Sequence, residues 1–308
     1  NIDELDGELR KLRSMLSEFS VKNNMRIVAA GTHPFSHWRD QVVTDKERYH
    51  GLFDSMQYVA RRLLIFGMHV HIGIANKDLR IDVMNQMRYF IPHILALSTS
   101  SPFWLGENTG FKSYRSIIFE DLPRTGVPEK FNSYNDYSQY VKTLIKANTI
   151  DEPTKIWWDI RPHHIYPTLE FRICDSCTTV NEAVGIAAII QALVAKMIDL
   201  RNNNQTWRNY RSSLVSENKW RAMKNGVNSK LIDFGKQKEI SYDNLISEIL
   251  EFIDDVVDEL GTRKKIEQFV NDTLKKGTSA DRQITEYNKS KNINSVVDML
   301  IEETISGC

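Results

Sequence analysis

Residues 66–74 of this chain read FGMHVHIGI and place two histidines inside an apolar run. Successive side chains of a β-strand point to opposite faces, so His69 and His71 would share one face of a strand. Two imidazoles on one face suit a metal ion or an anionic substrate, but this stretch alone favours a pair of hydrogen-bonded core histidines. The other polar residues that the chain brings to this face decide between these interpretations.

Further strand-like pieces alternate polar and apolar residues, and their polar residues are types that take part in catalysis. These pieces are SYR (113–115), DIR (159–161) and TLEFR (168–172). In the last of them, Thr168, Glu170 and Arg172 would share one face. An exposed face of Glu–Arg pairs would contribute little stability. Apolar neighbours indicate that these pieces are half buried, and burying arginines, carboxylates and imidazoles is costly unless something binds there.

The chemistry that these residue types indicate is the handling of anions beside a metal ion. Arg115, Arg161 and Arg172 offer planar forks for carboxylate or phosphate. Glu170 and one of the histidines could bind a hard divalent cation that is shared with phosphates. A zinc hydrolase would need three protein ligands. The sequence has no H-E-x-x-H, P-loop, G-x-G-x-x-G or G-x-S-x-G motif to support another chemistry.

The overall composition excludes several classes of partner. Forty basic residues balance forty acidic ones in 308 residues, so we expect no nucleic-acid partner and no binding to a membrane surface. The longest apolar run, 184–198, contains Gln191 and Lys196 and is too short for a membrane span, so we interpret it as a core helix. Three cysteines make no disulfide framework, which favours a reducing, cytoplasmic location.

The pattern of apolar residues predicts an α+β protein, with residues 1–308 forming one catalytic domain whose part 201–308 is mainly helical. Residues 3–23 are predicted as an amphipathic helix, because Leu5, Leu9, Leu12, Leu16 and Phe19 recur at spacings of three and four. Strands are predicted at 26–31, 66–74, 155–162 and 168–175, helices at 50–64, 79–99, 133–148 and 180–200, and long loops at 104–135.

Five motifs occur in an order that resembles one enzyme family. They are GTHPF (31–35), FGMHVHIGI (66–74), LALSTSSPFWLGENTGFKSYRS (95–116), WWDIRP (157–162) and TLEFRICD (168–175). Together with ENKWRAMKNGVNSKLID (217–233), they resemble the glutamate–cysteine ligase type 2 family, the bacterial carboxylate–amine ligases. The resemblance covers about 26–290, which is most of the chain.

The resemblance implies a fold similar to the catalytic domain of glutamine synthetase. A mostly antiparallel sheet, packed with helices, would form one wall of a funnel that ATP and glutamate enter from opposite ends. The γ-carboxylate of glutamate would attack ATP to give an acyl phosphate. An amine, cysteine in this family, would then displace phosphate. ATP would be a co-substrate and Mg²⁺ or Mn²⁺ the cofactor.

The resemblance also implies roles for individual residues. His69 and Glu170 would hold the metal ion, and Arg172 would face the phosphates of ATP. From their planar forks together with this resemblance, we expect Arg172, Arg161 and Arg115 to be the catalytic residues. The substrate would be bound by His71, Arg115, Arg161 and Thr168, where Thr168 replaces the first arginine of the R-x-E-x-R pattern. Whether His71 binds metal, contacts substrate or supports a ligand is left open.

One departure from the pattern qualifies these expectations. The family carries a strand resembling G-x-E-x-E before its first helix, and its glutamates are expected to bind metal. This sequence starts at Asn1 within that helix, so we expect a central strand and half of the metal ligands to be missing from it. Activity of such a chain is open, as is a homodimer. The alternatives are a ligase for a different amine and a catalytically weak binding or regulatory relative.

Overall fold

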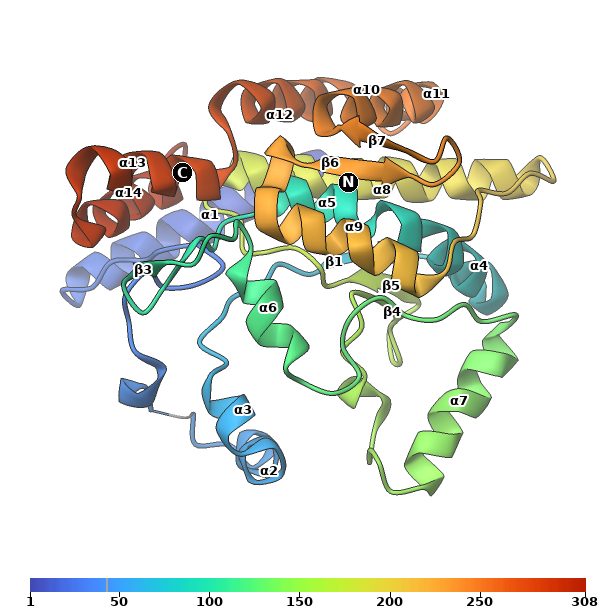
Figure 1. The fold of residues 1–308 in the computed structure, drawn as a ribbon, viewed down its shortest axis with the longest axis horizontal. Coiled ribbons are helices and arrows are strands. Elements are labelled where there is room, and N and C mark those ends of the chain that lie inside the picture. Colours follow the sequence, from blue (N-terminus) through green and yellow to red (C-terminus); the bar gives the residue numbers. More distant parts are fainter. Residues whose placement is uncertain (43) are drawn as a thin grey trace.

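The computed structural model describes residues 1–42 and 44–308, with positions 48 and 52 described by their backbone only. Its main sheet has three antiparallel strands in the order β1–β5–β4, namely β1 (Val70–Gly73), β5 (Thr168–Phe171) and β4 (Ile160–Pro162) (Figure 1). Two small antiparallel pairs accompany it: β2 (Phe103–Trp104) with β3 (Glu107–Asn108), and β6 (Lys230–Asp233) with β7 (Lys238–Ser241).

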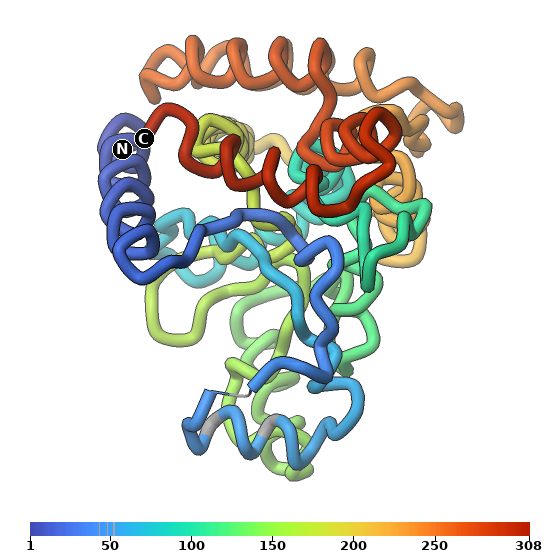
Figure 2. The backbone as a smooth tube through the Cα atoms, turned by 90° about the vertical axis from the view of Figure 1, so that its left-hand side faces the viewer, coloured from blue at the N-terminus to red at the C-terminus, as the bar shows by residue number. Residues whose placement is uncertain are grey.

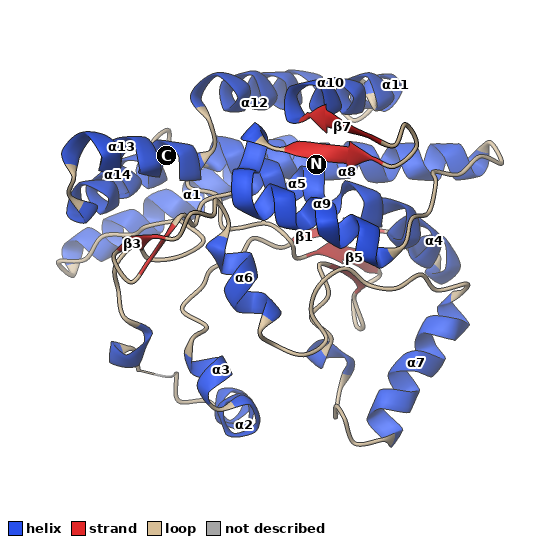
Figure 3. Ribbon diagram, viewed as in Figure 1, coloured by secondary structure: helices blue, strands red, loops and turns tan. Residues whose placement is uncertain are grey.

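Helices make up most of the described chain, as Figure 3 shows. The helices that precede β4 in the chain are α1 (Ile2–Lys22), α2 (Glu47–Met56), α3 (Tyr58–Arg61), α4 (Lys77–Met87), α5 (Ile91–Ser98), α6 (Tyr114–Glu120) and α7 (Tyr134–Lys146). The helices that follow β5 are α8 (Val180–Asn202), α9 (Ser212–Asn225), α10 (Tyr242–Phe252), α11 (Asp254–Val257), α12 (Arg263–Lys276), α13 (Ser279–Ser290) and α14 (Ile293–Ile305). Short 3-10 turns lie at Trp38–Asp40, Arg88–Phe90, Pro153–Lys155 and Gly226–Asn228. The predicted α+β class is confirmed.

The long helix α8 forms the centre of the core. Thr179 caps its first turn, accepting from the backbone N–H of Glu182 while the Glu182 carboxylate accepts from the N–H of Thr179. The helix is long and apolar enough to span a membrane, yet 67% of its most apolar stretch is buried inside the molecule. It packs against α1, α4 and α12, as a core helix does.

The main sheet is apolar on one face only. Ile160, Leu169 and Phe171 are fully buried and join the same core as α8 and α4. Because side chains alternate along a strand, the residues between them point to the other face. In Figure 1, α5, α8 and α9 lie above the sheet, while α2, α3 and α7 extend below it. One face of the sheet packs in the core, so the polar side chains of a functional site can lie only on the other face.

The predicted strand at 26–31 is wrong, because this segment has no regular secondary structure. It is attached by single contacts: the N–H of Gly31 donates to the carbonyl of Ser100 at 3.2 Å, and Thr32 forms an isolated bridge with Ile65. Val28 and Ala30 of this apolar run pack with Phe103, Val296 and Leu300, away from the core that packs against the main sheet.

The prediction of long loops over 104–135 is also partly wrong. The segment contains the hairpin β2–β3 at its start, and α6 occupies seven of its residues. The piece SYR, which the alternation predicts as strand-like, supplies Ser113 just before α6 and the first two residues of that helix. The strand interpretation of Arg115 is therefore incorrect.

Candidate functional site

The polar face of the sheet brings together residues from three strands. Glu170 lies in the central strand β5, directly opposite His71 in β1 and Arg161 in β4. His69 comes one residue before β1, and its Nδ1 still lies 3.4 Å from Oε1 of Glu170. The predicted convergence of these side chains on one face is therefore what the structure shows. We call His69, His71, Arg161, Glu170 and Arg172 the sheet cluster.

The carboxylate of Glu170 is the centre of the sheet cluster and is only 3% exposed. Arg161 donates from Nε to Oε2 at 2.7 Å, and Arg172 donates from Nη1 to Oε1 at 2.6 Å. Burial by itself would raise the pKa of Glu170, but the hydrogen bonds and charges of the two guanidinium groups outweigh it and lower the pKa to about 2. Glu170 is therefore ionised at neutral pH.

The two histidines form the more open part of the sheet cluster, with each side chain 36% exposed. Burial and the charge of Arg172 lower the pKa of His69 to about 3. Its Nδ1 lies 3.3 Å from Nη1 of Arg172, and because a guanidinium only donates, Nδ1 accepts and the neutral ring carries its proton on Nε2. His71 contacts Thr168 between Nδ1 and Oγ1 at 3.0 Å.

The three arginines differ in how completely they are paired. Arg161 uses Nη1 for the carbonyls of Thr154 and Ile156, in addition to its bond with Glu170. Arg172 has Glu170 and His69 as partners, and its buried Nε has no hydrogen-bond partner among the described residues. A buried donor without an acceptor is costly, so Arg172 is the arginine of the sheet cluster whose buried Nε is available to an acceptor of a ligand.

Arg115 lies beneath the sheet cluster rather than at its surface. Its side chain is 5% exposed and donates from Nη1 and Nη2 to the carbonyls of Ile173 and Arg172. A side chain at Gly67 would overlap the guanidinium, which explains the glycine there. Arg115 therefore supports the chain that leaves β5, and its predicted contact with substrate stays a prediction that rests on the unpaired Nε.

His163 is a neighbour of the sheet cluster that sequence reasoning missed. Its ring centroid lies 5.3 Å from that of His71, in the turn between β4 and β5. Its Nδ1 accepts from the backbone N–H groups of Ile165 at 3.2 Å and Tyr166 at 3.0 Å. This fixes the proton of the neutral ring on Nε2, so His163 presents a donor beside His71. The two adjacent histidines in HHIYP (163–167) were the sequence feature that could have indicated this neighbour.

Lys219 is a second residue that the sequence did not reveal. It is 2% exposed, and its Nζ lies 2.6 Å from both Oδ2 of Asp159 and Oε1 of Glu120. Burial opposes the charge of Lys219, but the two carboxylates outweigh it and raise its pKa. This ion triad ties α9 and α6 to the residue before β4, and no local pattern could have predicted a contact between such distant segments.

The sheet cluster fits an anion better than a bare cation. One carboxylate faces two guanidinium groups while His69 is neutral, so the net charge is positive. His69 and Glu170 are close enough to bind one ion, but both oxygens of Glu170 already accept from arginines. Across residues 1–42 and 44–308, no group of three His, Cys, Asp or Glu side chains is placed to hold a metal ion. The metal assignment stays a prediction.

The α+β fold carries buried, incompletely paired arginines on its sheet, and these residues mark a candidate site for anionic groups. Comparison with known proteins gives the family. A model of the glutamate-cysteine ligase family 2 (GCS2) matches residues 1–299. The chain belongs to this family.

Individual relatives agree with the family match. A protein of Herpetosiphon aurantiacus named "Putative glutamate--cysteine ligase 2" is 50% identical over 99% of this chain and 79% of its own length. A protein of the same name from Chloroflexus aurantiacus is also 50% identical, over 99% of this chain and 78% of its own length. A crystal structure of a glutamate–cysteine ligase from Francisella tularensis in complex with AMP superimposes with a TM-score of 0.67. It is 15% identical and covers 99% of this chain and 78% of that one, which shows a shared fold.

Proposed function

We propose that this protein is an ATP-dependent ligase that joins the γ-carboxylate of glutamate to the amine of cysteine through an acyl phosphate. Membership of the glutamate-cysteine ligase family supports the reaction class. The relative with the same fold was crystallised with AMP, which supports a nucleotide as one substrate. A cytoplasmic location is part of the proposal, since it gives access to ATP and suits the buried free thiols of Cys174 and Cys177.

The observation that carries the proposal is the unsatisfied guanidinium of Arg172. Its Nε is buried without an acceptor in the described part of the chain, on a sheet face with net positive charge. A phosphoryl oxygen would accept from this group in a charge-assisted hydrogen bond. Arg161 holds Glu170 from the other side, so the carboxylate keeps a partner when Arg172 turns towards the phosphoryl group.

The proposed reaction has two steps. A γ-carboxylate oxygen of glutamate bonds to the γ-phosphorus of ATP while the bond from that phosphorus to the bridging oxygen breaks, releasing ADP. The amine nitrogen then bonds to the acyl carbon, the bond from that carbon to the phosphate oxygen breaks, and the nitrogen loses a proton. Arg172 would donate to the phosphoryl group in the first step, where negative charge is redistributed over its oxygens. No covalent bond to the protein is formed.

A divalent cation would bind between His69 and Glu170, where it would neutralise phosphate charge. Arg161 and Arg172 already hold the carboxylate, so we expect the ion to bind only together with the phosphates of ATP. The phosphates would draw Arg172 away from Glu170 and would also be ligands of the ion. Electron paramagnetic resonance of Mn²⁺ tests this without activity. Protein-bound Mn²⁺ should be seen with ATP and not without it, and strong binding of Mn²⁺ alone would contradict the shared site.

Oxygen transfer distinguishes the proposed reaction from the alternatives. Glutamate labelled with ¹⁸O in its γ-carboxylate is incubated with ATP, magnesium and cysteine, and the phosphate produced is examined by ³¹P NMR. One labelled oxygen should appear in phosphate. Unlabelled phosphate would exclude the acyl phosphate. Labelled phosphate with another amine but not with cysteine would identify a different ligase, and no nucleotide turnover with any amine would indicate a binding relative.

A further inference from the structure

The polar face of the main sheet has two ends that carry different side chains. At one end, Arg172 follows β5 and contacts His69. At the other end, Thr168 begins β5, and its carbonyl accepts from the backbone N–H of His163 at 2.9 Å. The two ends of β5 are about 10 Å apart, at roughly 3.3 Å per residue. One phosphoryl group cannot contact both ends, so a ligand held by Arg172 leaves the second end to another chemical group.

His163 at this second end is held in one orientation by its own turn. Its Nδ1 accepts from the backbone N–H groups of Ile165 at 3.2 Å and Tyr166 at 3.0 Å. The ring of Tyr166 stacks on the imidazole with a centroid distance of 4.9 Å. Because Nδ1 accepts, the proton of the neutral ring lies on Nε2. The turn therefore fixes a donor before any ligand arrives, which lowers the cost of binding one.

This donor is free and lies against the sheet cluster. Across the described part of the chain, no group accepts a hydrogen bond from Nε2 of His163. The imidazole lies edge-to-face with that of His71, with the centroids 5.3 Å apart. Burial lowers the pKa of His163, and the charge of Glu170 opposes this shift, so the two side chains are within electrostatic reach. His163 thus adds a neutral N–H donor to the cluster.

The next histidine in the turn differs from His163 in each of these respects. Figure 2 shows the turn, in yellow-green, projecting from the middle of the molecule and well below α12–α14. His163 is half buried in it, whereas His164 is exposed. The ring of His164 contacts that of His163 at 4.9 Å, and no residue of the described chain holds its nitrogens. His164 is therefore a matched control for any role of His163.

A carboxylate is the ligand group that suits the free donor. The sheet cluster has a net positive charge, and the N–H of a neutral imidazole only donates. In the proposed reaction, glutamate has its γ-carboxylate at the phosphoryl group near Arg172. When glutamate is extended along β5, its α-carboxylate is directed towards His163. Cysteine, the second amino acid of the reaction, also carries an α-carboxylate.

We propose that His163 determines substrate specificity by donating from Nε2 to the α-carboxylate of an amino-acid substrate. This inference rests on the proposed ligase function and adds to it a residue that recognises an amino acid. The polar face then has two subsites, one for the phosphoryl group at Arg172 and one for the α-carboxylate at the turn between β4 and β5. A hydrogen bond to a charged acceptor contributes about 10- to 100-fold in affinity.

Calorimetry with paired ligands tests the contact without turnover. Binding of glutamate is compared with that of its α-amide, which lacks the α-carboxylate, in the presence of Mg²⁺ and a non-hydrolysable ATP analogue. The wild-type protein should bind glutamate at least tenfold more tightly than the α-amide. Removing the donor of His163 should reduce this preference by about 10- to 100-fold, because the α-carboxylate then has one hydrogen bond fewer.

The variant His163→Asn separates the donor from the shape of the turn. The side-chain oxygen of asparagine can accept from the same backbone N–H groups as Nδ1 does, but asparagine has no donor at the position of Nε2. The preference for glutamate should therefore be lost while the thermal unfolding temperature stays close to that of the wild type. His163→Ala should show the same loss of preference, and His164→Asn should keep the wild-type preference.

A second pair of ligands identifies which amino acid supplies the carboxylate. Cysteine is compared with cysteamine, which lacks the carboxylate, in the presence of glutamate, Mg²⁺ and the ATP analogue. If His163→Asn removes the preference for cysteine and leaves that for glutamate, the α-carboxylate bound by His163 belongs to cysteine. The reverse result assigns it to glutamate, and either result supports the contact.

Two outcomes would contradict the inference in different ways. If His163→Asn keeps the wild-type preference for both amino acids, His163 does not bind an α-carboxylate. The proposed reaction would still stand in that case, provided that labelled oxygen passes from glutamate to phosphate. If the wild-type protein binds neither glutamate nor cysteine, the proposed function itself fails together with this inference.

Discussion

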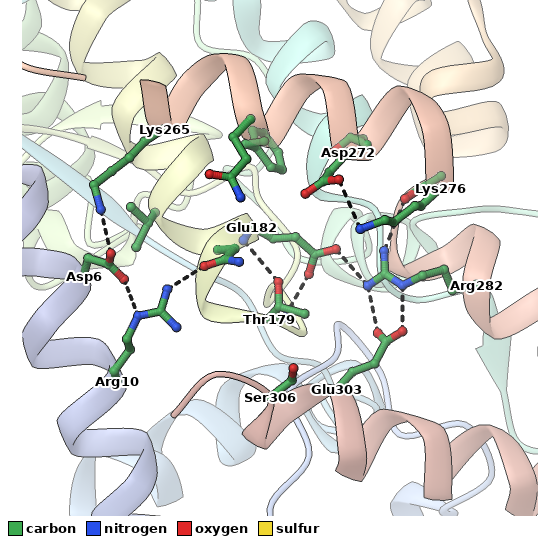
Figure 4. Close-up of a pocket in the computed structure, with 16 residues that line it drawn as sticks. Asp6, Arg10, Thr179, Glu182, Lys265, Asp272, Lys276, Arg282, Glu303 and Ser306 are labelled. Carbon is green, nitrogen blue, oxygen red and sulfur yellow. Dashed lines mark hydrogen bonds and ion pairs between the residues drawn. The ribbon is translucent and has the colours of Figure 1, made fainter. Parts of the chain in front are cut away.

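Charged side chains gather at two places in this molecule, the sheet cluster and a cleft between helices. The cleft has a volume of about 550 Å³ and lies among α1, α8, α12, α13 and α14 (Figure 4). Its charged lining consists of Asp6, Glu182, Asp272 and Glu303 with Arg10, Lys265, Lys276 and Arg282. Acidic and basic residues are thus present in equal number there, whereas arginines are in excess over carboxylates in the sheet cluster.

The arginines of the two regions differ in their hydrogen bonds. Arg282 in the cleft uses all three of its nitrogens: Nε and Nη2 donate to Glu303 at 2.8 Å, Nη2 also to Glu182, and Nη1 to the carbonyl of Gly277. Arg172 in the sheet cluster has a buried Nε with no acceptor in the described chain. The cleft therefore joins helices from both ends of the chain, whereas the sheet cluster keeps a buried donor without an acceptor. This difference is the reason for proposing that the ligand binds at the sheet rather than in the cleft.

The largest expected effect is the loss of stability on removing the carboxylate of the sheet cluster. Glu170→Gln leaves two buried guanidinium groups without their shared counter-charge, which should lower the free energy of unfolding by about 3–5 kcal/mol. Glu303→Gln in the cleft should cost less, roughly 1–2 kcal/mol, because Arg282 keeps Glu182. Urea unfolding measures both. Equal losses would remove the distinction between the two regions.

Arg172 and Arg282 should differ most in their effect on activity. Arg172→Lys keeps the charge but loses the planar fork, and should lower kcat by about 100- to 1000-fold, or 2.7–4 kcal/mol, while the binding of glutamate changes little. Arg282→Lys, the same change in the cleft, should leave kcat unchanged. The assay is ADP formation at saturating magnesium, glutamate and cysteine. A decrease of less than about tenfold for Arg172→Lys in folded protein would place Arg172 outside the chemistry.

The low pKa of Glu170 gives the stability of the sheet cluster a pH dependence. The pKa of this carboxyl is about 2 in the folded protein against an ordinary 4.5, so the unfolded chain binds its proton first as the pH falls. The resulting stabilisation is fully present above pH 4.5 and is lost as the pH falls towards 2, in total about 3 kcal/mol. The difference in unfolding free energy between wild type and Glu170→Gln should shrink over this range. A constant difference would contradict the charged pairing.

The smallest effect is expected from a single charge of the cleft. Lys265→Met removes a lysine that is 28% exposed, while Asp6 keeps its bond with Arg10. The change should lower the unfolding free energy by less than about 1 kcal/mol and leave kcat unchanged. A larger loss, or a loss of activity, would show that the cleft has a role beyond joining helices.

The sequence predicted those parts of the site that follow from strand alternation. HVH and TLEFR place His71 and Glu170 on one face because the period of a strand is fixed, and the structure pairs these two residues directly. The long apolar run likewise identified α8 as the central helix, since its length and composition suit full burial.

Other features depend on contacts that sequence periodicity does not report. Ser113 and Arg115 alternate like strand residues, yet a short helix begins there. Asp175 accepts from the hydroxyl of Ser113, and the hydroxyl oxygen of Ser101 accepts from the backbone N–H of Arg115. Lys219 meets its carboxylates across 60 residues or more of chain. Helix α1 is anchored by Arg10 and Arg13, which donate to the carbonyls of Gly307, Thr178 and Thr304, all far from them in sequence.

The position of bound nucleotide tests the central claim, that unpaired arginines on the sheet mark the functional site. The measurement is a crystal structure of the protein with Mg²⁺ and a non-hydrolysable ATP analogue. We expect the γ-phosphate on the polar face of the sheet, within hydrogen-bond distance of Nε of Arg172, with the helical cleft free of nucleotide. A triphosphate bound by Lys265 and Arg282 in the cleft, with Arg172 still paired only to Glu170 and His69, would contradict the account.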